Sequence, residues 1–284
     1  ALVLMLGAVA CFPVMQAAVK TLSIDHGMSF IQTTWGRYFF HFLLVPLLFP
    51  GTLRRLRDAE RVGIQLTRGV LLFVGTGCAF LSLRYLALPM VTALSFIAPI
   101  LITVLAAVFL REAVGWRRWT AVGAGFIGVI FIVRPDAGFS WPMVLPLVMA
   151  SVYAVYQVLT RVVGARADAS VSLFFTALVG AVAATLFVPF VWIWPTPMGW
   201  VLMIGSALMG GLGHWLMILA YRQAQASFVA PFAYTELIWA AVLGYVVFDQ
   251  GIGATAWTGA AIIVASGLYI AYRERVRARR RQVA

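Results

Sequence analysis

One stretch of the sequence places a carboxylate, a phenol, an indole and a proline inside an apolar run. The run extends from about residue 228 to residue 248 and contains Pro231, Tyr234, Glu236 and Trp239. It is long enough to span a bilayer, where an ionisable side chain is costly and normally faces a partner or a water-filled cavity. Glu236 could bind a cationic group, take up a proton or pair with an arginine; a purely structural role is equally open.

The side chains around Glu236 suggest one wall of a site. Four residues would share one face of a continuous helix here, namely Phe232, Glu236, Trp239 and Leu243. Tyrosine and tryptophan often lie at the membrane interface, but Tyr234 and Trp239 are too deep in the run for that. We expect them to form an aromatic wall for an apolar or flat substrate.

A second deep charge lies in the apolar run from residue 28 to residue 49. Arg37 is nine residues into this run, too deep for its guanidinium to reach the interface easily. It could form a structural ion pair, for instance with Glu236, or bond to helix carbonyls. Alternatively, it could be the counter-charge for a substrate carboxylate.

A histidine and a tryptophan, His214 and Trp215, follow a glycine cluster in the run from residue 198 to residue 221. Small residues let membrane helices approach closely, and they could also lend flexibility to a conformational cycle. A lone histidine is more often a packing residue than a ligand. Beside an indole and facing a cavity, His214 could instead contact a substrate.

Similar residues recur in the two halves of the chain. Three pairs lie 141 positions apart: Phe12 with Tyr153, Gln16 with Gln157, and Lys20 with Arg161. If the halves have opposite orientations, Gln16 and Gln157 face opposite sides of the membrane, as paired gate residues would. An interhelical hydrogen bond is the alternative for each.

The composition is that of a membrane protein. Hydrophobic residues make up 63% of the 284 residues, charged residues make up 11%, and the mean hydropathy is +0.98. The net charge of +12 comes from arginines in short loops and the tail, a pattern that orients membrane proteins, so we do not expect nucleic-acid binding. Cys11 and Cys78 lie in apolar runs and are interpreted as small buried side chains.

The sequence lacks the short motifs of common enzymes. It contains no His-Glu-x-x-His, no Gly-x-Ser-x-Gly, no phosphate-binding loop and no Cys/His cluster with metal-ligand spacing. We therefore expect no enzymatic activity, no cofactor and no metal.

Ten apolar runs are candidates for membrane helices. They cover approximately residues 2–22, 28–49, 64–86, 89–110, 117–133, 142–163, 170–193, 198–221, 226–248 and 254–272. With a cytoplasmic N-terminus, 17 of the 21 Lys and Arg residues fall in inner loops or the tail and three on the outer side. We therefore predict an all-α membrane protein with ten transmembrane helices and both termini in the cytoplasm.

An odd number of helices in each half imposes opposite orientations on the halves. We predict a first five-helix repeat at residues 1–136 and a second, inverted five-helix repeat at residues 137–284, ending in a basic cytoplasmic tail. Inverted repeats with a site near the membrane midplane recur among transporters.

Three motifs give the whole chain a resemblance to the EamA-type drug/metabolite transporter superfamily. They are Trp35-Gly-Arg37-Tyr38, then Phe109-Leu-Arg-Glu112 followed by Trp119 and Gly128, then Val229-Ala-Pro-Phe-Ala-Tyr234 followed by Trp239, Gly244 and Phe248-Asp249. Asp249 departs from the glutamate that Glu112 in the first half would suggest. Within the superfamily, the chain looks most like the YddG-type exporters of aromatic amino acids.

This resemblance implies a central cavity lined by the third, fourth, eighth and ninth helices, with the first and sixth contributing, and alternating access by rocking of the halves. From depth and helix face we infer the residues nearest the cavity: Phe80, Ser95, Pro99, His214, Trp215, Tyr234, Glu236 and Trp239. Gln16, Gln157 and Arg37 are expected to be gate residues or structural polar residues.

The resemblance also implies a multi-pass protein of the bacterial cytoplasmic (inner) membrane, with a small-molecule substrate and the lipid bilayer as partners. We predict a secondary transporter that exports small metabolites, namely amino acids with aromatic or apolar side chains. The alternative is a proton-coupled exporter of drugs and lipophilic cations that uses Glu236. The oligomeric state stays open, and a monomer is compatible with the sequence.

Overall fold

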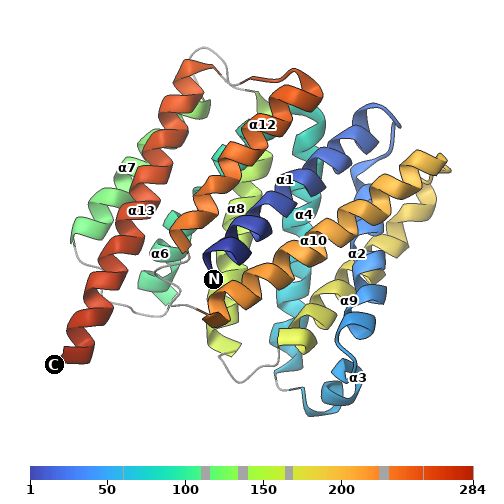
Figure 1. The fold of residues 1–284 in the computed structure, drawn as a ribbon, viewed down its shortest axis with the longest axis horizontal. Helices are drawn as coiled ribbons and strands as arrows, with labels where there is room; N and C mark the ends of the chain where they lie inside the picture. Colours follow the sequence, from blue (N-terminus) through green and yellow to red (C-terminus); the bar gives the residue numbers. More distant parts are fainter. Residues whose placement is uncertain are drawn as a thin grey trace.

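The computed structural model describes residues 1–59, 61–109, 116–133, 140–163, 169–223, 230–251 and 253–283, and all regular structure in these ranges is helical. The longer helices are α1 (Leu2–Ile24), α2 (Phe30–Leu48), α4 (Val62–Tyr85), α5 (Leu88–Ser95), α6 (Ala98–Phe109), α7 (Trp116–Val133), α8 (Val144–Val163), α9 (Ala169–Phe187), α10 (Pro197–Gln223), α12 (Glu236–Phe248) and α13 (Ala254–Val283). The short segments are α3 (Thr52–Arg55), η1 (Leu56–Asp58), η2 (Trp141–Met143), η3 (Val188–Phe190) and η4 (Ala230–Thr235). Figure 1 shows the long helices side by side, with α3 and the C-terminal end of α13 at the same edge of the molecule.

Seven helical spans in the described residues are long and apolar enough to cross a bilayer. They are Leu2–Ile24, Val62–Tyr85, Leu88–Phe109, Trp141–Thr160, Ser170–Phe190, Pro197–Met217 and Ala254–Arg273, and two shorter apolar helices cover Trp119–Ile132 and Phe232–Phe248. Helix α2 is not among them. It carries polar residues, of which Gln32, Thr33 and Thr34 are buried. The number of crossings and the side of each terminus stay predictions.

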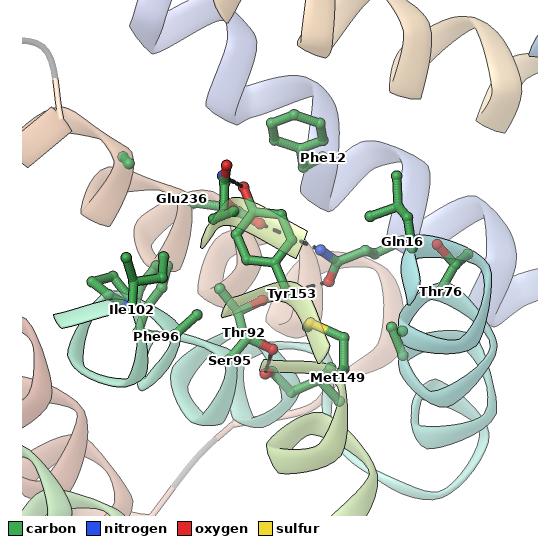
Figure 2. Close-up of a pocket in the computed structure, with 18 of the residues that line it drawn as sticks. Phe12, Gln16, Thr76, Thr92, Ser95, Phe96, Ile102, Met149, Tyr153 and Glu236 are labelled. Carbon is green, nitrogen blue, oxygen red and sulfur yellow. Dashed lines mark hydrogen bonds between the residues drawn. The ribbon is translucent and has the colours of Figure 1, made fainter. Parts of the chain in front are cut away.

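Two of the expected spans, 89–110 and 226–248, are not continuous α-helices. The first breaks into α5 and α6 at Phe96 and Ile97, and the described part of the second, residues 230–248, consists of the 3-10 helix η4 followed by α12. Pro99 has no N–H to bond the Ser95 carbonyl, and it lies in the first turn of α6, where proline is tolerated. Figure 2 shows that Ser95, Phe96 and Glu236, which lie beside the two breaks, surround one space.

The last helix is longer than expected. The apolar run ends near residue 272, but α13 continues to Val283 through the basic tail. Arginine and glutamate have high helix propensity, so a helix that has already started can continue through them. Some of the family motifs lie outside the described residues, namely Leu110, Arg111, Glu112 and Val229.

The helices pair extensively in four combinations: α1 with α10, α7 with α13, α4 with α8, and α2 with α9. Small residues make several of these approaches possible. A Cβ at Gly128 in α7 would lie 2.8 Å from the backbone oxygen of Gly259 in α13, and a Cβ at Gly213 in α10 would lie 3.1 Å from the backbone oxygen of Ala8 in α1. Packing explains these glycines, because small residues bring membrane helices together.

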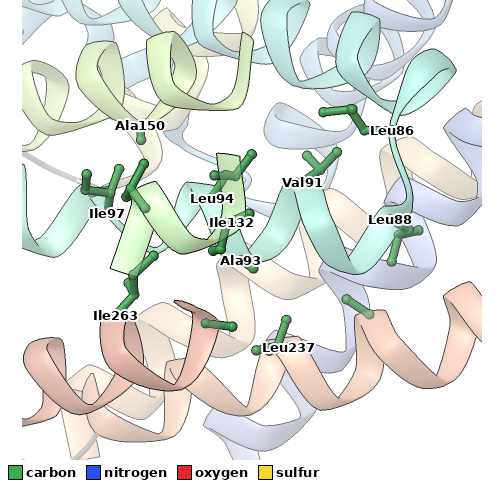
Figure 3. Packing of buried hydrophobic residues seen from close by; sticks show 14 of the residues in the cluster. Leu86, Leu88, Val91, Ala93, Leu94, Ile97, Ile132, Ala150, Leu237 and Ile263 are labelled. Atoms are coloured by element: carbon green, nitrogen blue, oxygen red, sulfur yellow. The ribbon is translucent and has the colours of Figure 1, made fainter. Parts of the chain in front are cut away.

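The largest buried apolar cluster surrounds α5. Figure 3 shows Val91, Leu94 and Ile97 packed among Ala150 of α8, Ile132 of α7, Leu237 of α12 and Ile263 of α13. Lys20 lies beside this cluster. Its Nζ donates hydrogen bonds to the carbonyl oxygens of two cluster residues, Leu83 at 2.7 Å and Leu86 at 2.5 Å. This ammonium is buried and satisfies carbonyls at the C-terminal end of α4, where a helix leaves acceptors unpaired.

Candidate functional site

A cavity of about 660 Å³ lies among the helices. Its lining comes from α1, α2, α4, α5, α6, α8, α10, η4, α12 and α13. The six helices expected to line the cavity, the first, third, fourth, sixth, eighth and ninth of the predicted spans, all contribute residues. Two further helices also contribute: α2 with Arg37, and α13 with Gly267, Ile270 and Ala271. The volume is in the range of pockets that hold small-molecule ligands.

Glu236 lies on one side of this cavity in a short chain of polar groups. The amide Nε2 of Gln16 donates to the carboxylate Oε1 of Glu236 at 3.3 Å, and the hydroxyl of Thr92 lies 3.5 Å from Gln16 Oε1. Figure 2 shows Gln16, Thr92 and Glu236 around the ring of Tyr153. Gln16 therefore connects α1 with α12 and α5 through the cavity wall, as the expected interhelical hydrogen bond would.

Gln157 of α8 also lines the cavity, but its hydrogen bond is to a different kind of partner from those of Gln16. Its Nε2 donates to the hydroxyl of Tyr153 at 2.6 Å, within the same helix. Tyr153 in turn stacks on Tyr156, with ring centroids 5.8 Å apart. Both glutamines line the cavity, and their possible role as gates stays a prediction.

Both helix breaks border the cavity. Ser95, Phe96 and Pro99 line it beside the first break, and Tyr234 and Glu236 line it beside the second. Irregular backbone at membrane depth is tolerated where it lines a cavity or is buried in protein. Gly267 of α13 makes room for Tyr234, because a Cβ on Gly267 would collide with the tyrosine hydroxyl.

Arg37 reaches the cavity from α2 and lies over an aromatic ring. Its guanidinium carbon is 5.5 Å from the ring centroid of Phe80 and 5.7 Å from that of Tyr38, the range of cation–π contacts. Gly210 of α10 is next to it, since a Cβ at this position would lie 3.7 Å from Arg37 Nε, an ordinary contact distance. Within the described residues Arg37 forms no hydrogen bond and no ion pair, so the expected alternative of an Arg37–Glu236 ion pair is not present.

His214 lines the cavity next to Phe12 and within electrostatic range of Arg37. The rings of Phe12 and His214 meet edge to face with 5.2 Å between centroids. His41, one helical turn from Arg37, is also close enough to both Arg37 and His214 for their charges to interact. This part of the cavity combines a guanidinium and an imidazole with two aromatic rings, those of Phe12 and Phe80.

The expectation that Trp215 and Trp239 face the cavity is wrong. Neither residue lines it, and their side chains are 43% and 44% exposed on the outer surface. In α10, His214 lines the cavity, and Trp215, about 100° further round the helix, does not. Trp239 lies in α12, three residues after Glu236, and α12 contributes Glu236 but not Trp239 to the described cavity lining.

The cavity also contains residues that the sequence did not assign to it. Phe12 and Tyr153 are the most informative, because each lies one helical turn from a predicted polar residue, Gln16 or Gln157, and hence on the same face. That spacing could have identified them. Gly267, Ile270 and Ala271 of α13 carry no comparable signal, since they are apolar residues in an apolar helix.

These features define a multi-pass membrane transporter with a central, partly polar cavity. The chain belongs to the EamA-like transporter family, which matches residues 1–134 and 140–272. It is therefore a transporter and not an enzyme.

Bacterial relatives of the chain are named for two kinds of substrate. The S-adenosylmethionine uptake transporter of Rickettsia bellii is 28% identical over 246 residues, covering 86% of this chain and 84% of the relative. The riboflavin transporter of Vibrio cholerae is 29% identical over 287 residues, covering 97% and 94%. A solved crystal structure with a TM-score of 0.61 and 18% identity covers 93% of this chain and 94% of its own, which supports the fold.

The comparisons support transport of small molecules but not the finer resemblance to exporters of aromatic amino acids. The relatives described above are named for S-adenosylmethionine and riboflavin. Family membership and the apolar helices together make the chain a membrane protein with several crossings.

Proposed function

We propose that the protein is a secondary transporter of the bacterial cytoplasmic membrane that moves small metabolites with an aromatic or apolar part. Amino acids with aromatic or apolar side chains belong to this class. The observation that carries the proposal is the cavity of about 660 Å³, whose lining contains the aromatic rings of Phe12, Phe80 and Tyr234 and the side chains of Arg37 and Glu236. S-adenosylmethionine and riboflavin, for which relatives are named, also contain flat ring systems.

The mechanism that we propose is alternating access between two five-helix halves, residues 1–136 and 137–284. Two observations support it. The four extensive helix pairs map onto one another when each helix is exchanged for its expected counterpart in the other half. The two broken spans are also counterparts, the fourth and the ninth, and interrupted helices in corresponding positions mark the substrate site in inverted-repeat transporters.

Export is the direction predicted from the sequence, whereas the rickettsial relatives are named for uptake. An alternating-access cycle is reversible, so the net direction follows from the gradients of substrate and coupling ion. The proposed transport is therefore tested by counterflow, which needs no assumption about direction. Proteoliposomes are loaded with unlabelled tryptophan, S-adenosylmethionine or riboflavin, and entry of the labelled compound is followed. We expect saturable counterflow for at least one compound; its absence for all three would refute the proposal.

The position of Glu236 keeps the alternative function open to test. A carboxylate in the cavity could carry protons and bind lipophilic cations. A proton-coupled drug exporter would move tetraphenylphosphonium when a pH gradient is imposed as the driving force. It would not exchange the three metabolites. The same proteoliposomes distinguish the two functions.

A further inference from the structure

We infer that Arg37 and His214 form a carboxylate-binding subsite in the cavity, so that the preferred metabolite carries a carboxylate next to its aromatic or apolar part. The inference rests on the proposed function and specifies the substrate class within it. It would assign Arg37 a binding role in place of the structural role that the sequence left open.

The argument begins with a comparison of two deep arginines. Arg68 does not line the cavity, and it donates four hydrogen bonds to neutral acceptors: Thr160 at 3.0 Å, Gln65 at 2.5 Å, Tyr156 at 3.2 Å and Ser172 at 3.4 Å. Arg37 lines the cavity and has only ring contacts among the described residues. A guanidinium offers five N–H donors; protein groups accept four hydrogen bonds from Arg68, whereas the donors of Arg37 face the cavity.

The second step concerns charge. Glu236 is the only carboxylate in the described cavity lining, and it accepts from Gln16 without pairing with Arg37. A charge removed from water without a counter-charge is costly. A ligand carboxylate would offset this cost, because its two oxygens match the planar fork of the guanidinium.

The third step concerns the type of anion. The described lining contains one guanidinium and no lysine, with His214 as the neighbouring donor. One fixed positive charge matches a single carboxylate better than a phosphate with two negative charges. The rings of Phe80 and Phe12, which contact Arg37 and His214, provide apolar surfaces beside the charge for the remainder of the ligand.

The test uses two ligand series in which the ring system is constant. The first contains tryptophan, indole-3-propionate, which lacks the amine, and tryptamine, which lacks the carboxylate. The second contains S-adenosylmethionine and 5′-methylthioadenosine, which lacks the amino-acid group. Riboflavin serves as the ligand without a carboxylate. Binding to purified protein is measured by ligand-induced thermal stabilisation, and transport is measured by competition in proteoliposomes.

One of the two series should contain ligands that the protein binds. In that series, we expect the members with a carboxylate to bind at least about ten-fold more tightly than the member without one, because a charge-assisted hydrogen bond contributes that much affinity. Arg37→Gln should abolish this preference, and Arg37→Lys should restore part of it, because a lysine keeps the charge but not the fork. Arg68→Gln is the matched control. It is expected to lower stability while leaving the ratio of affinities within a series unchanged.

The outcomes separate this inference from the proposed function. Equal recognition of ligands with and without the carboxylate, transport of riboflavin alone, or a preference that survives Arg37→Gln would overturn the subsite and leave the transporter standing. Absence of saturable transport for every compound would overturn both. If Arg37→Gln does not fold, the wild-type ratio within each series and the Arg37→Lys ratio still decide the question.

Discussion

The rings of Phe96 and Tyr234 meet edge to face, with 5.1 Å between their centroids and an angle of 76° between their planes. Phe96 immediately follows α5, and Tyr234 lies in the last turn of η4, so this contact joins the two interrupted spans. Both rings also line the cavity. The two helix breaks and the proposed substrate site are therefore parts of one structural unit. A relative movement of the two proposed halves would change the contacts that these rings make with a bound ligand.

Replacement of the cavity carboxylate tests its charge separately from its hydrogen bond. Glu236→Gln keeps an oxygen that can accept from the Gln16 amide, so we expect the variant to fold. We expect affinity for amine-bearing ligands such as tryptophan to fall about ten-fold, because a charge-assisted hydrogen bond becomes a neutral one. Indole-3-propionate, which has no amine, should be affected less. Transport of tryptophan and indole-3-propionate at several pH values measures both effects.

Two outcomes would contradict this prediction. Unchanged transport at every pH would make Glu236 structural. A selective loss of proton-dependent movement of tetraphenylphosphonium would favour the alternative function.

Neighbouring residues in α10 should differ sharply in their effect on binding. Trp215 is exposed on the outer surface, so Trp215→Leu should leave the affinity for the recognised ligand unchanged. His214 lines the cavity beside Arg37, and His214→Leu should weaken carboxylate-bearing ligands several-fold by removing a donor. Ligand titrations of both variants in the same detergent check the difference. A larger effect of Trp215→Leu on affinity would mean that the face of α10 has been assigned incorrectly.

The buried ammonium of Lys20 should contribute to stability. Lys20→Met removes the donor to the carbonyl oxygens of Leu83 and Leu86, and we expect the free energy of unfolding to fall by about 1–3 kcal/mol. Lys20→Arg keeps a cationic donor and should lose less. Thermal unfolding of the purified variants gives the comparison. Equal stability of Lys20→Met and wild type would show that water replaces the ammonium at these carbonyls.

The contact between α7 and α13 should tolerate no added volume at its closest point. Gly128→Ala would place a Cβ 2.8 Å from the Gly259 backbone oxygen, so we expect a loss of about 1–3 kcal/mol from overpacking. Gly123, in the same helix, meets no atom within 4 Å, so Gly123→Ala should be neutral or stabilising by up to about 1 kcal/mol. Thermal unfolding measures both. If the two variants lose stability equally, helix packing is not the reason for Gly128.

Much of the helical organisation could be predicted from the sequence alone. Apolar runs of bilayer length, separated by polar or proline-containing links, locate helices because the lipid core excludes unpaired backbone groups. The break between α4 and α5 before Pro89 was predicted in this way and is confirmed. The polar residues inside apolar runs, above all Glu236 and Arg37, pointed to the cavity because charge is costly in lipid and needs a polar environment.

Only the tertiary structure decided which of these groups meet. Sequence spacing cannot show that Glu236 contacts Gln16 of α1, 220 residues away, or that Arg37 lies over Phe80 instead of pairing with Glu236. Nor does it show how far the cavity extends along α12, which is why Trp239, three residues after Glu236, was wrongly placed. The physical reason is that hydropathy reports the depth of a residue in the membrane, whereas its partners depend on how the helices rotate and pack against one another.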